Sequence, residues 1–236
     1  ESFSSNALLD PTPSPTPTPT LIVTKTADTN DGACNADCSL REAIAAANAN
    51  ADADVIGFNI PGSGVHTINV LSALPLITRP VTIDGYTQEP GVSHPNTQED
   101  SNDAVLLIEL KGSDAAVGTN GLVLEDPNIV IRGLVINGFP NHGIITLTSG
   151  TNNCTIKGNF IGTDPTGMVA VPNNDGININ VGTGHLIGGT DPADRNIISG
   201  NTAPGLAFNS GSNTVEGNFI GVAADGHTPL GNGTGI

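Results

Sequence analysis

After Asp54, most of the chain consists of short runs of Val, Ile and Leu separated by Gly, Asn, Asp and Pro. Apolar runs of two to four residues bounded by turn residues predict short strands. One segment differs, because residues 39–48 are good helix formers throughout and Ser39 is followed three residues later by Glu42, which forms a capping box. The pattern therefore predicts many strands and one short helix that begins at Ser39 and ends near 48–50.

The chain also repeats itself. The segment 157–162 recurs as 216–221 at an offset of 59 residues, and nine of the 21 positions in 157–177 are identical at that offset. A smaller unit, Gly followed by an apolar residue, begins at positions 121, 143, 176, 205 and 235. A second phrase ends in Gly and begins at 130, 155, 197 and 214, and the base period is about 22 residues.

A unit of this length without a helix is typical of one coil of a parallel β-helix, because propeller blades need about 40 residues and the leucine-rich consensus is absent. Equivalent residues of successive coils should stack about 4.8 Å apart. We therefore expect Phe160 with Phe219, and Ile161 with Ile220, in inward-facing columns. Asn159 should sit at a turn and bond to the coil above or below.

The charge balance excludes one class of partner. Seven Lys and Arg stand against 23 Asp and Glu, a net charge of −16, so we expect no nucleic-acid binding. No apolar run reaches the roughly 18 residues of a membrane span, and none is expected. The chain opens at Glu1 without a basic leader, which predicts a mature secreted product located outside the cell or on its surface.

Residues 11–20 alternate Pro with Thr or Ser and predict an extended polyproline II spacer. The predicted organisation is an arm at 1–10, this spacer, a segment with one strand and one helix at 21–54, and the repeats at 55–236. Such tracts outside the cell are often O-glycosylated. The candidates are Thr12, Thr16, Thr18 and Thr20.

Cys34 and Cys38 lie four residues apart around a turn, which predicts a disulfide in a secreted chain. Cys154 has no partner in the sequence and is expected as a small, buried core residue. The acidic turn that starts at Asp28 superficially resembles a calcium loop, but position 12 of that pattern is Ser39, not Glu. An Asx turn is the expected structure.

The segment Cys38-Ser39-Leu40-Arg41-Glu42-Ala43 resembles the motif of the CSLREA-domain proteins, which are large secreted or surface-attached bacterial proteins. The resemblance extends from residue 21 over nearly the whole chain, including segments 58–64, 81–85, 131–136 and 159–164. It implies a cap at the amino end of a pectin-lyase-like β-helix, with no activity attached to the motif. The predicted fold class is all-β: a right-handed parallel β-helix (solenoid) with an N-terminal capping strand and one short helix.

A non-enzymatic extracellular structural or adhesive role is the leading functional hypothesis, and a polysaccharide lyase or glycoside hydrolase is the alternative. Enzymes of those kinds need facing carboxylates or a basic group with cations, whereas the seven basic residues here are dispersed. Lys157 and Glu216 occupy equivalent positions and could share a face, while Arg195 should hold its own loop. The five His lack metal spacing, so no catalytic, metal or cofactor-binding residue is assigned and no cofactor is expected.

A carbohydrate-binding module is a further alternative. Sugar platforms use exposed aromatic rings, and Tyr86 is the single Tyr in a chain without Trp. Loops 163–174 and 222–233 share one register of the repeat and should project from one side, where they could bind surface glycans.

The final hypothesis concerns self-association. By the 59-residue register Ile236 corresponds to Ile177, so the repeat region should be open at its C-terminal end and invite pairing. We expect head-to-tail association into a fibre in which residues Ala7, Leu8 and Leu9 add to a neighbour's sheet edge. The alternative is a truncation at 236 that leaves a monomeric stalk segment.

Overall fold

The computed structural model describes residues 18–89 and 91–236, and its strands form three parallel sheets. The first sheet contains seven strands in the order β1 (Leu21–Val23), β2 (Asp54–Phe58), β4 (Val81–Asp84), β7 (Val130–Arg132), β10 (Thr155–Lys157), β13 (Leu186–Gly188) and β16 (Thr214–Glu216). The second contains β3 (His66–Asn69), β5 (Ile108–Lys111), β8 (Leu134–Asn137), β11 (Phe160–Ile161), β14 (Ile197–Ile198) and β17 (Phe219–Ile220). The third contains β6 (Leu122–Leu124), β9 (His142–Thr146), β12 (Asp175–Ile179) and β15 (Leu206–Phe208).

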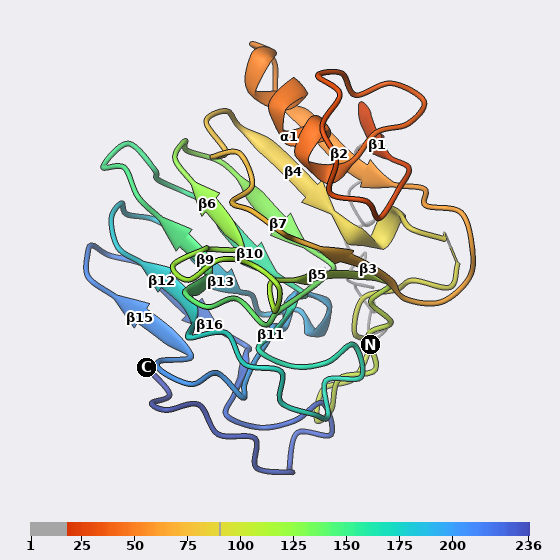
Figure 1. Ribbon diagram of the computed structural model, residues 1–236. Coiled ribbons are helices and arrows are strands. Elements are labelled where there is room, and N and C mark those ends of the chain that lie inside the picture. The colour runs from red at the N-terminus through yellow and green to blue at the C-terminus, as the bar shows by residue number, and fades with distance from the viewer. Residues whose placement is uncertain (1–17, 90) are drawn as a thin grey trace, which may run out of the picture.

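The chain visits the three sheets in rotation. From β4 it runs through β5 and β6 and returns to the first sheet at β7, and three further circuits follow the same order. Every strand pair within the sheets is parallel, as the stacked arrows in Figure 1 show. The regular secondary structure of the described residues is thus mostly strand, with one α-helix, α1 (Leu40–Ala49), and two 3-10 turns, Gly85–Thr87 and Pro192–Asp194.

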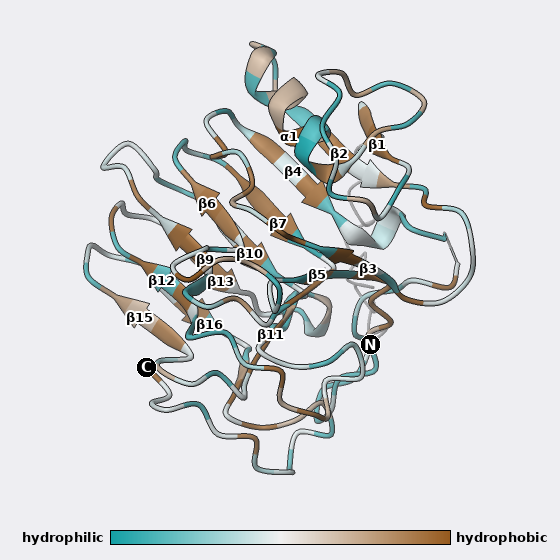
Figure 2. Ribbon diagram, viewed as in Figure 1, coloured by the Kyte–Doolittle hydropathy of each residue, from teal (hydrophilic) through white to brown (hydrophobic). Residues whose placement is uncertain are grey.

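Inward-facing residues that repeat from strand to strand build the core. In the first sheet these residues stand in register as a single column: Leu21, Ile56, Ile83, Ile131, Ile156, Ile187 and Val215. The other two sheets add Ile68, Leu110, Ile136, Ile161, Ile198 and Ile220, and Leu122, Ile144, Ile177 and Leu206. Figure 2 shows the hydrophobic strands that carry them. Each fully buried side chain of this size contributes about 1.5–3 kcal/mol.

The predicted repeat matches the third sheet. Leu122, Ile144, Ile177 and Leu206, each preceded by Gly, are register partners on neighbouring strands. The second phrase was partly misassigned: the segments at 130, 155 and 214 lie in the first sheet, but 197–200 provides β14 of the second. The first sheet instead uses β13. This phrase therefore occurs at strand ends in both the first and the second sheet, so it does not identify the sheet.

The prediction for Phe160 and Phe219 was wrong about the face. Both stand in one column with Ile197, as register partners in the second sheet, but they belong to a separate hydrophobic cluster on the outer face. Ile161 and Ile220 take the inward positions, because adjacent residues of a strand point to opposite faces. Leu106 and Ala224, from long connections, cover the outer cluster.

Two ladders of Asn side chains run along the corners between sheets. At the first corner the Asn159 amide donates to Asn196 Oδ1 at 3.1 Å, and the Asn196 amide donates to Asn218 Oδ1 at 2.8 Å. At the second corner Asn173, Asn201 and Asn232 repeat this pattern at 3.1 and 2.9 Å. Each ladder Asn also donates to a backbone carbonyl of an earlier circuit, so the turns keep their polar groups satisfied while buried.

Helix α1 confirms the predicted start and end. Ser39 is its N-cap, and the reciprocal bonds between Ser39 and Glu42 form the capping box. The predicted disulfide joins Cys34 to Cys38 directly before the helix. Leu40 and Ala43 are buried in the main core, so the apolar members of the motif attach the helix to the end of the first sheet.

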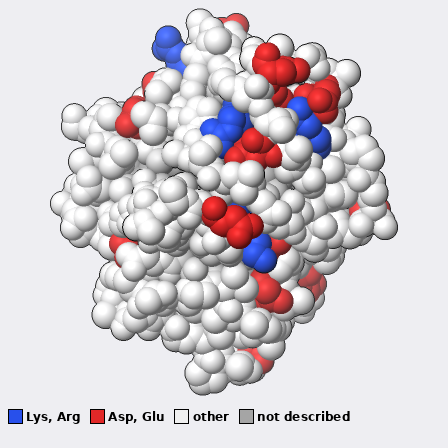
Figure 3. Space-filling model, in the orientation of Figure 1, with Lys and Arg blue, Asp and Glu red and all other residues white. Residues whose placement is uncertain are grey.

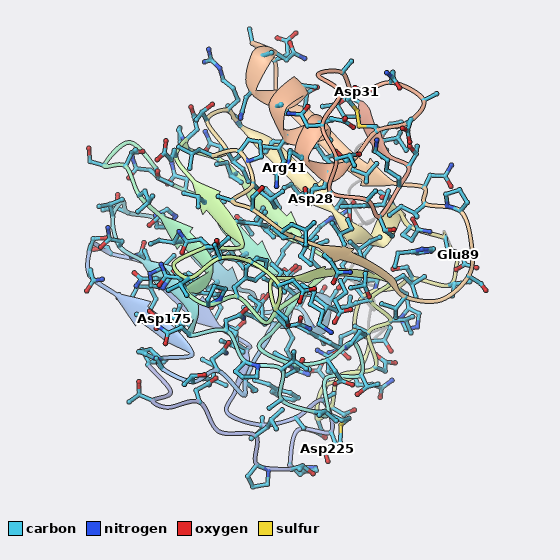
Figure 4. The ribbon with its side chains drawn as sticks, in the orientation of Figure 1. Asp28, Asp31, Arg41, Glu89, Asp175 and Asp225 are labelled. Atoms are coloured by element: carbon cyan, nitrogen blue, oxygen red, sulfur yellow. A yellow bond between two sulfur atoms is a disulfide. The ribbon has the colours of Figure 1, made fainter. Side chains whose placement is uncertain are left out.

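Arg41 ties the acidic turn to the same end of the molecule. Its guanidinium donates to both carboxylate oxygens of Asp28, at 2.9 and 2.8 Å, and to the carbonyls of Ser72 and Ala73. Figure 4 shows Arg41 and Asp28 side by side below the helix. Asn30 accepts the backbone N–H of Gly32, so this turn is an Asx turn, as expected. Residues 38–43 therefore all contribute to the fold, through the disulfide, the helix cap, the core contacts and the ion pair.

The Asn ladder generates the first prediction. Asn196→Ala removes the central amide of one ladder and leaves the Ile156 carbonyl without its donor. Each buried group that loses its partner costs about 1–3 kcal/mol, so the free energy of unfolding should fall by about 3 kcal/mol in urea denaturation. Asn209→Ala is the matched control, because Asn209 is exposed and makes only 3.4 Å contacts; its effect should stay within about 0.5 kcal/mol. Equal effects of both variants would contradict this role.

A second prediction concerns acid stability. Burial would raise the pKa of Glu42, but N–H groups of Ser39 and Asp31, the Ser39 hydroxyl and the charge of Lys25 outweigh it and lower the pKa from 4.5 to about 2. A depressed carboxyl pKa gives stability that is complete above the unfolded value and is lost as the pH falls towards the folded value. The melting temperature should therefore fall between pH 4.5 and 2. Glu42→Gln should start lower and fall less over this interval, and a parallel fall would refute the assignment.

Candidate functional site

A cavity lies on the outer face of the first sheet, beside β2, β4 and β7. Its volume is about 660 Å³. Apolar walls come from Pro19, Ile22, Phe58 and Pro95, and the polar lining consists of Asn59, Asp84, Tyr86, Thr87, Ser93 and Arg132. An apolar pocket with a few convergent polar groups is the default place to look for a ligand.

An ion pair joins two polar residues of the cavity. Asp84 and Arg132 end neighbouring strands in register, and Arg132 Nη2 donates to Asp84 Oδ2 at 2.6 Å. The Asp84 side chain is completely buried, whereas that of Arg132 keeps 23% of its exposure. The second carboxylate oxygen accepts the backbone N–H of Tyr86. Both carboxylate oxygens of Asp84 thus have partners within the protein.

Tyr86 lines one side of the cavity, and its hydroxyl group also has a partner within the protein. Its hydroxyl donates to the Gly158 carbonyl at 2.7 Å. Burial, and then the charge of Asp84, raise the pKa of Tyr86 well above its usual value, so the phenol stays protonated. The side chain is half-buried and belongs to the edge of the outer hydrophobic cluster, so it does not present an open sugar platform.

The predicted alignment of Lys157 with Glu216 does not produce a pair. Lys157 stands next to Arg132 in the register, but its ammonium lies 2.9 Å from Asp194 Oδ1, in the turn after β13. Glu216 is separated from it by Gly188 of the intervening strand. The turn could not be placed from the repeat alone, because residues 189–196 are an insertion that the short corners after β7, β10 and β16 lack.

Arg195 holds a distant segment, which corrects the prediction that it holds its own loop. The guanidinium donates to the carbonyls of Gln98 and Ser101, both at 2.8 Å, and to that of Gly217 at 3.0 Å. It also lies over the Phe219 ring, 4.3 Å from the centroid. These contacts stabilise the covering of the outer hydrophobic cluster.

The cavity offers limited chemistry. Among its lining residues Asp84 is the single carboxylate and Arg132 the single cation, and each neutralises the other. Glycoside hydrolysis needs two carboxylates about 5–10 Å apart across the bond. Within residues 18–89 and 91–236, no group of three or more His, Cys, Asp or Glu side chains is placed to hold a metal ion.

A His–carboxylate contact lies away from this cavity, at the start of β9 and β12 in the third sheet. His142 Nδ1 lies 2.9 Å from Asp175 Oδ2, and the two residues are register partners on β9 and β12. The amides of Asn174 and Asn178 also donate to Asp175, which Figure 4 labels. Sequence spacing alone missed this contact, because 33 residues separate the two positions.

The two loops predicted to share a register form similar hairpins. Each is closed by an antiparallel bridge, Thr163 with Ala170 and Val222 with Pro229. In each an Asp accepts bonds from its own loop, and those bonds lower the pKa of Asp225 to about 2. The second loop stacks on the first through the Ala224 N–H and the Gly167 carbonyl. Their polar groups are therefore used to build the loops.

The remaining predicted residues divide by position. Ala7, Leu8, Leu9, Thr12 and Thr16 lie outside the described residues. Thr18 is exposed, and the Thr20 hydroxyl donates to Asp54 Oδ1 at 2.8 Å while the Thr20 N–H donates to the Val55 carbonyl. From residue 18 onward, the first backbone hydrogen bond to the first sheet is that of Thr20. At the other end of the chain, 71% of Ile236 is exposed.

Cys154 is buried directly before β10, and burial raises its pKa to about 11, which keeps the thiol protonated. No helix in the described part of the chain is both long and apolar enough to cross a bilayer. Figure 3 shows acidic and basic side chains in adjacent pairs below the helix, with large areas of the same face carrying neither.

The buried ion pair generates the third prediction. Arg132→Met leaves the Asp84 charge buried without its partner, so the free energy of unfolding should fall by about 3 kcal/mol. Arg79→Met is the control, because Arg79 is exposed. Adding Asp84→Asn to Arg132→Met should restore part of the loss. Urea denaturation of the four proteins measures this, and a single variant as stable as the control would overturn it.

Known proteins add no function to this geometry. A scan against protein-family models matched none, and a search of curated proteins found no match. The resemblance to CSLREA-domain proteins stays a prediction that depends on the residues of the motif and the repeats. The functional argument therefore rests on the sheets, the cavity and the cap.

Proposed function

We propose that this chain is a right-handed parallel β-helix with an N-terminal cap and that it serves a structural or adhesive role outside the cell. The rotation of the chain through three parallel sheets supports the β-helix, because successive circuits then stack in one direction. Crossovers between parallel strands are right-handed in almost all proteins, which supports the hand. Strand β1, the disulfide turn and α1 cover the start of the first sheet and fit a cap.

One observation carries the structural role: the charged groups of the candidate cavity are used within the fold. Asp84 neutralises Arg132, and neighbouring Lys157 is paired with Asp194. A catalytic acid or base must be able to exchange a proton with a substrate, and these groups are held by internal partners. An extended wall without such groups suits a shaft or an adhesive surface.

The disulfide supports the location. The Cys34–Cys38 bond persists in oxidising compartments, such as the extracellular space or the periplasm. Association head to tail through Ala7, Leu8, Leu9 and Ile236 stays a prediction, as does attachment of glycans to the threonines.

A polysaccharide-active enzyme is the second candidate, and the cavity is the observation that favours it. The cavity lies on a sheet face with Asp84, Tyr86 and Arg132 in its wall. Such an enzyme would have to open the ion pair when a sugar chain binds. The two candidate functions thus differ in whether the protein cleaves a polysaccharide at this cavity.

The fourth prediction tests this difference. The full chain, incubated with a panel of acidic and neutral polysaccharides, should produce no new reducing ends and no unsaturated products above a heat-denatured control. Sedimentation with insoluble members of the panel measures adhesion in the same samples. Turnover that Asp84→Asn abolishes and Asp175→Asn preserves would place an enzyme at the cavity and overturn the structural role.

A further inference from the structure

Three residues that the proposed function does not use meet on the outer face of the second sheet. Lys111 on β5 and Asn137 on β8 are register partners on adjacent parallel strands. Glu109 lies two residues before Lys111 on the same strand, so the side chains of all three leave the same face of the sheet. Neighbouring strands are about 4.8 Å apart, so a lysine side chain easily spans the step to its partner.

Asn137 is held in an unusual state for an amide. The side chain is completely buried, and its Nδ2 donates to Glu109 Oε1 at 2.8 Å and to the Thr163 carbonyl at 2.9 Å. Its Oδ1 is buried without a hydrogen-bond partner among the described residues. The Thr163 contact fixes the orientation, because only the NH2 group can donate to that carbonyl.

Glu109 is a buried carboxyl group beside this amide. It is 7% exposed, and its Oε2 accepts the Thr67 hydroxyl at 2.6 Å. None of the ion pairs among the described residues includes Glu109 or Lys111. The side chains that donate to Glu109 are neutral: the Thr67 hydroxyl binds Oε2 and the Asn137 amide binds Oε1.

A second lysine near two carboxylates shows what an ordinary ion pair looks like in this chain. Lys25 lies 3.0 Å from Asp37 and 3.5 Å from Glu42. The Asp37 side chain is 72% exposed, and backbone N–H groups help to lower the pKa of Glu42 to about 2, so the Glu42 carboxylate stays ionised. The group at Lys111 differs in having a buried amide and a carboxyl group without a cation.

We propose that Lys111 and Asn137 condense into an isopeptide bond, with Glu109 carrying the protons. The Lys111 ammonium first gives a proton to Glu109, and the neutral Nζ attacks Asn137 Cγ. The Nζ–Cγ bond forms while the electron pair of the carbonyl moves to Oδ1.

The collapse of this adduct completes the reaction. Nδ2 donates to Glu109 Oε1 at 2.8 Å before the reaction, and its lone pair becomes available once Cγ is tetrahedral. Glu109 gives its proton to that lone pair, and the electron pair returns from Oδ1 as the Cγ–Nδ2 bond breaks. Nζ gives its second proton to Glu109, which passes it to the departing ammonia. The products are a secondary amide, an ammonium ion and the regenerated Glu109 carboxylate, so atoms and charge balance without an oxidant or cofactor.

The bond would close one complete circuit of the chain. Between β5 and β8 the chain passes through β6 and β7, and the new amide joins the first and last strands of that circuit. Like a disulfide, the bond would act between residues far apart in the sequence, but reducing agents would not break it.

The test is the mass of the full chain after reduction of its disulfide. We expect a mass about 17 Da below that of the sequence, which corresponds to the released ammonia, and a tryptic peptide pair joined between Lys111 and Asn137. Lys111→Arg and Glu109→Gln should each restore the full mass and remove the joined pair. Lys157→Arg is the matched control on another sheet face and should retain both signatures.

One competing reaction has the same mass. Asn137 precedes Gly138, and a succinimide at such a pair also releases ammonia, although the Gly138 N–H donates to the Val171 carbonyl here. Tandem mass spectrometry separates the two products, because the succinimide lies within one peptide and is lost on mild alkaline treatment. An unmodified mass for the full chain, or a loss confined to the peptide that contains Asn137 and Gly138, would overturn the proposal.

Discussion

Parallel strands of successive circuits pair in register, and the rest of the molecule depends on this pairing. Each strand satisfies its backbone groups with the circuits on either side, so a residue type that suits one position is repeated along the column. The Ile columns of the core follow directly from that repetition. At the corners the strand ladders stop, and the two Asn ladders supply the donors and acceptors that the backbone alone would lack.

The same constraint explains how charge is distributed. A column on the outer face places side chains about 4.8 Å apart, so like charges would repel at every step. Asp84 next to Arg132 relieves this, and Lys157 turns to Asp194 in an adjacent turn. At the start of the first sheet, beside β1 and β2, Arg41 and Glu42 make the corresponding bonds to turns. Ion pairs within the described residues therefore include four of the seven basic residues: Lys25, Arg41, Arg132 and Lys157.

Local signals in the sequence were sufficient for part of this structure. The capping box, the disulfide and the Gly-marked strands of the third sheet depend on residues close together or on a regular interval, and the structure has all three. The outward face of Phe160 could not be predicted, because it depends on connections that cover the second sheet and bring Leu106 and Ala224 over it. Asn196 was missed because its circuit contains an insertion and so departs from the 59-residue offset. The partners of Lys157 and Arg195 lie in such insertions too.

The contacts of Arg195 have a consequence for how the molecule unfolds. In a repeat protein whose units touch only their neighbours, the last unit can open alone. Here segment 96–102 is held by Arg195, by the Pro192 carbonyl and by the Ala224 carbonyl, so the final circuits also fasten an early connection more than 90 residues away. Opening the last circuits would therefore also expose the outer hydrophobic cluster of the second sheet. The array should therefore lose its structure as one cooperative block rather than fray circuit by circuit.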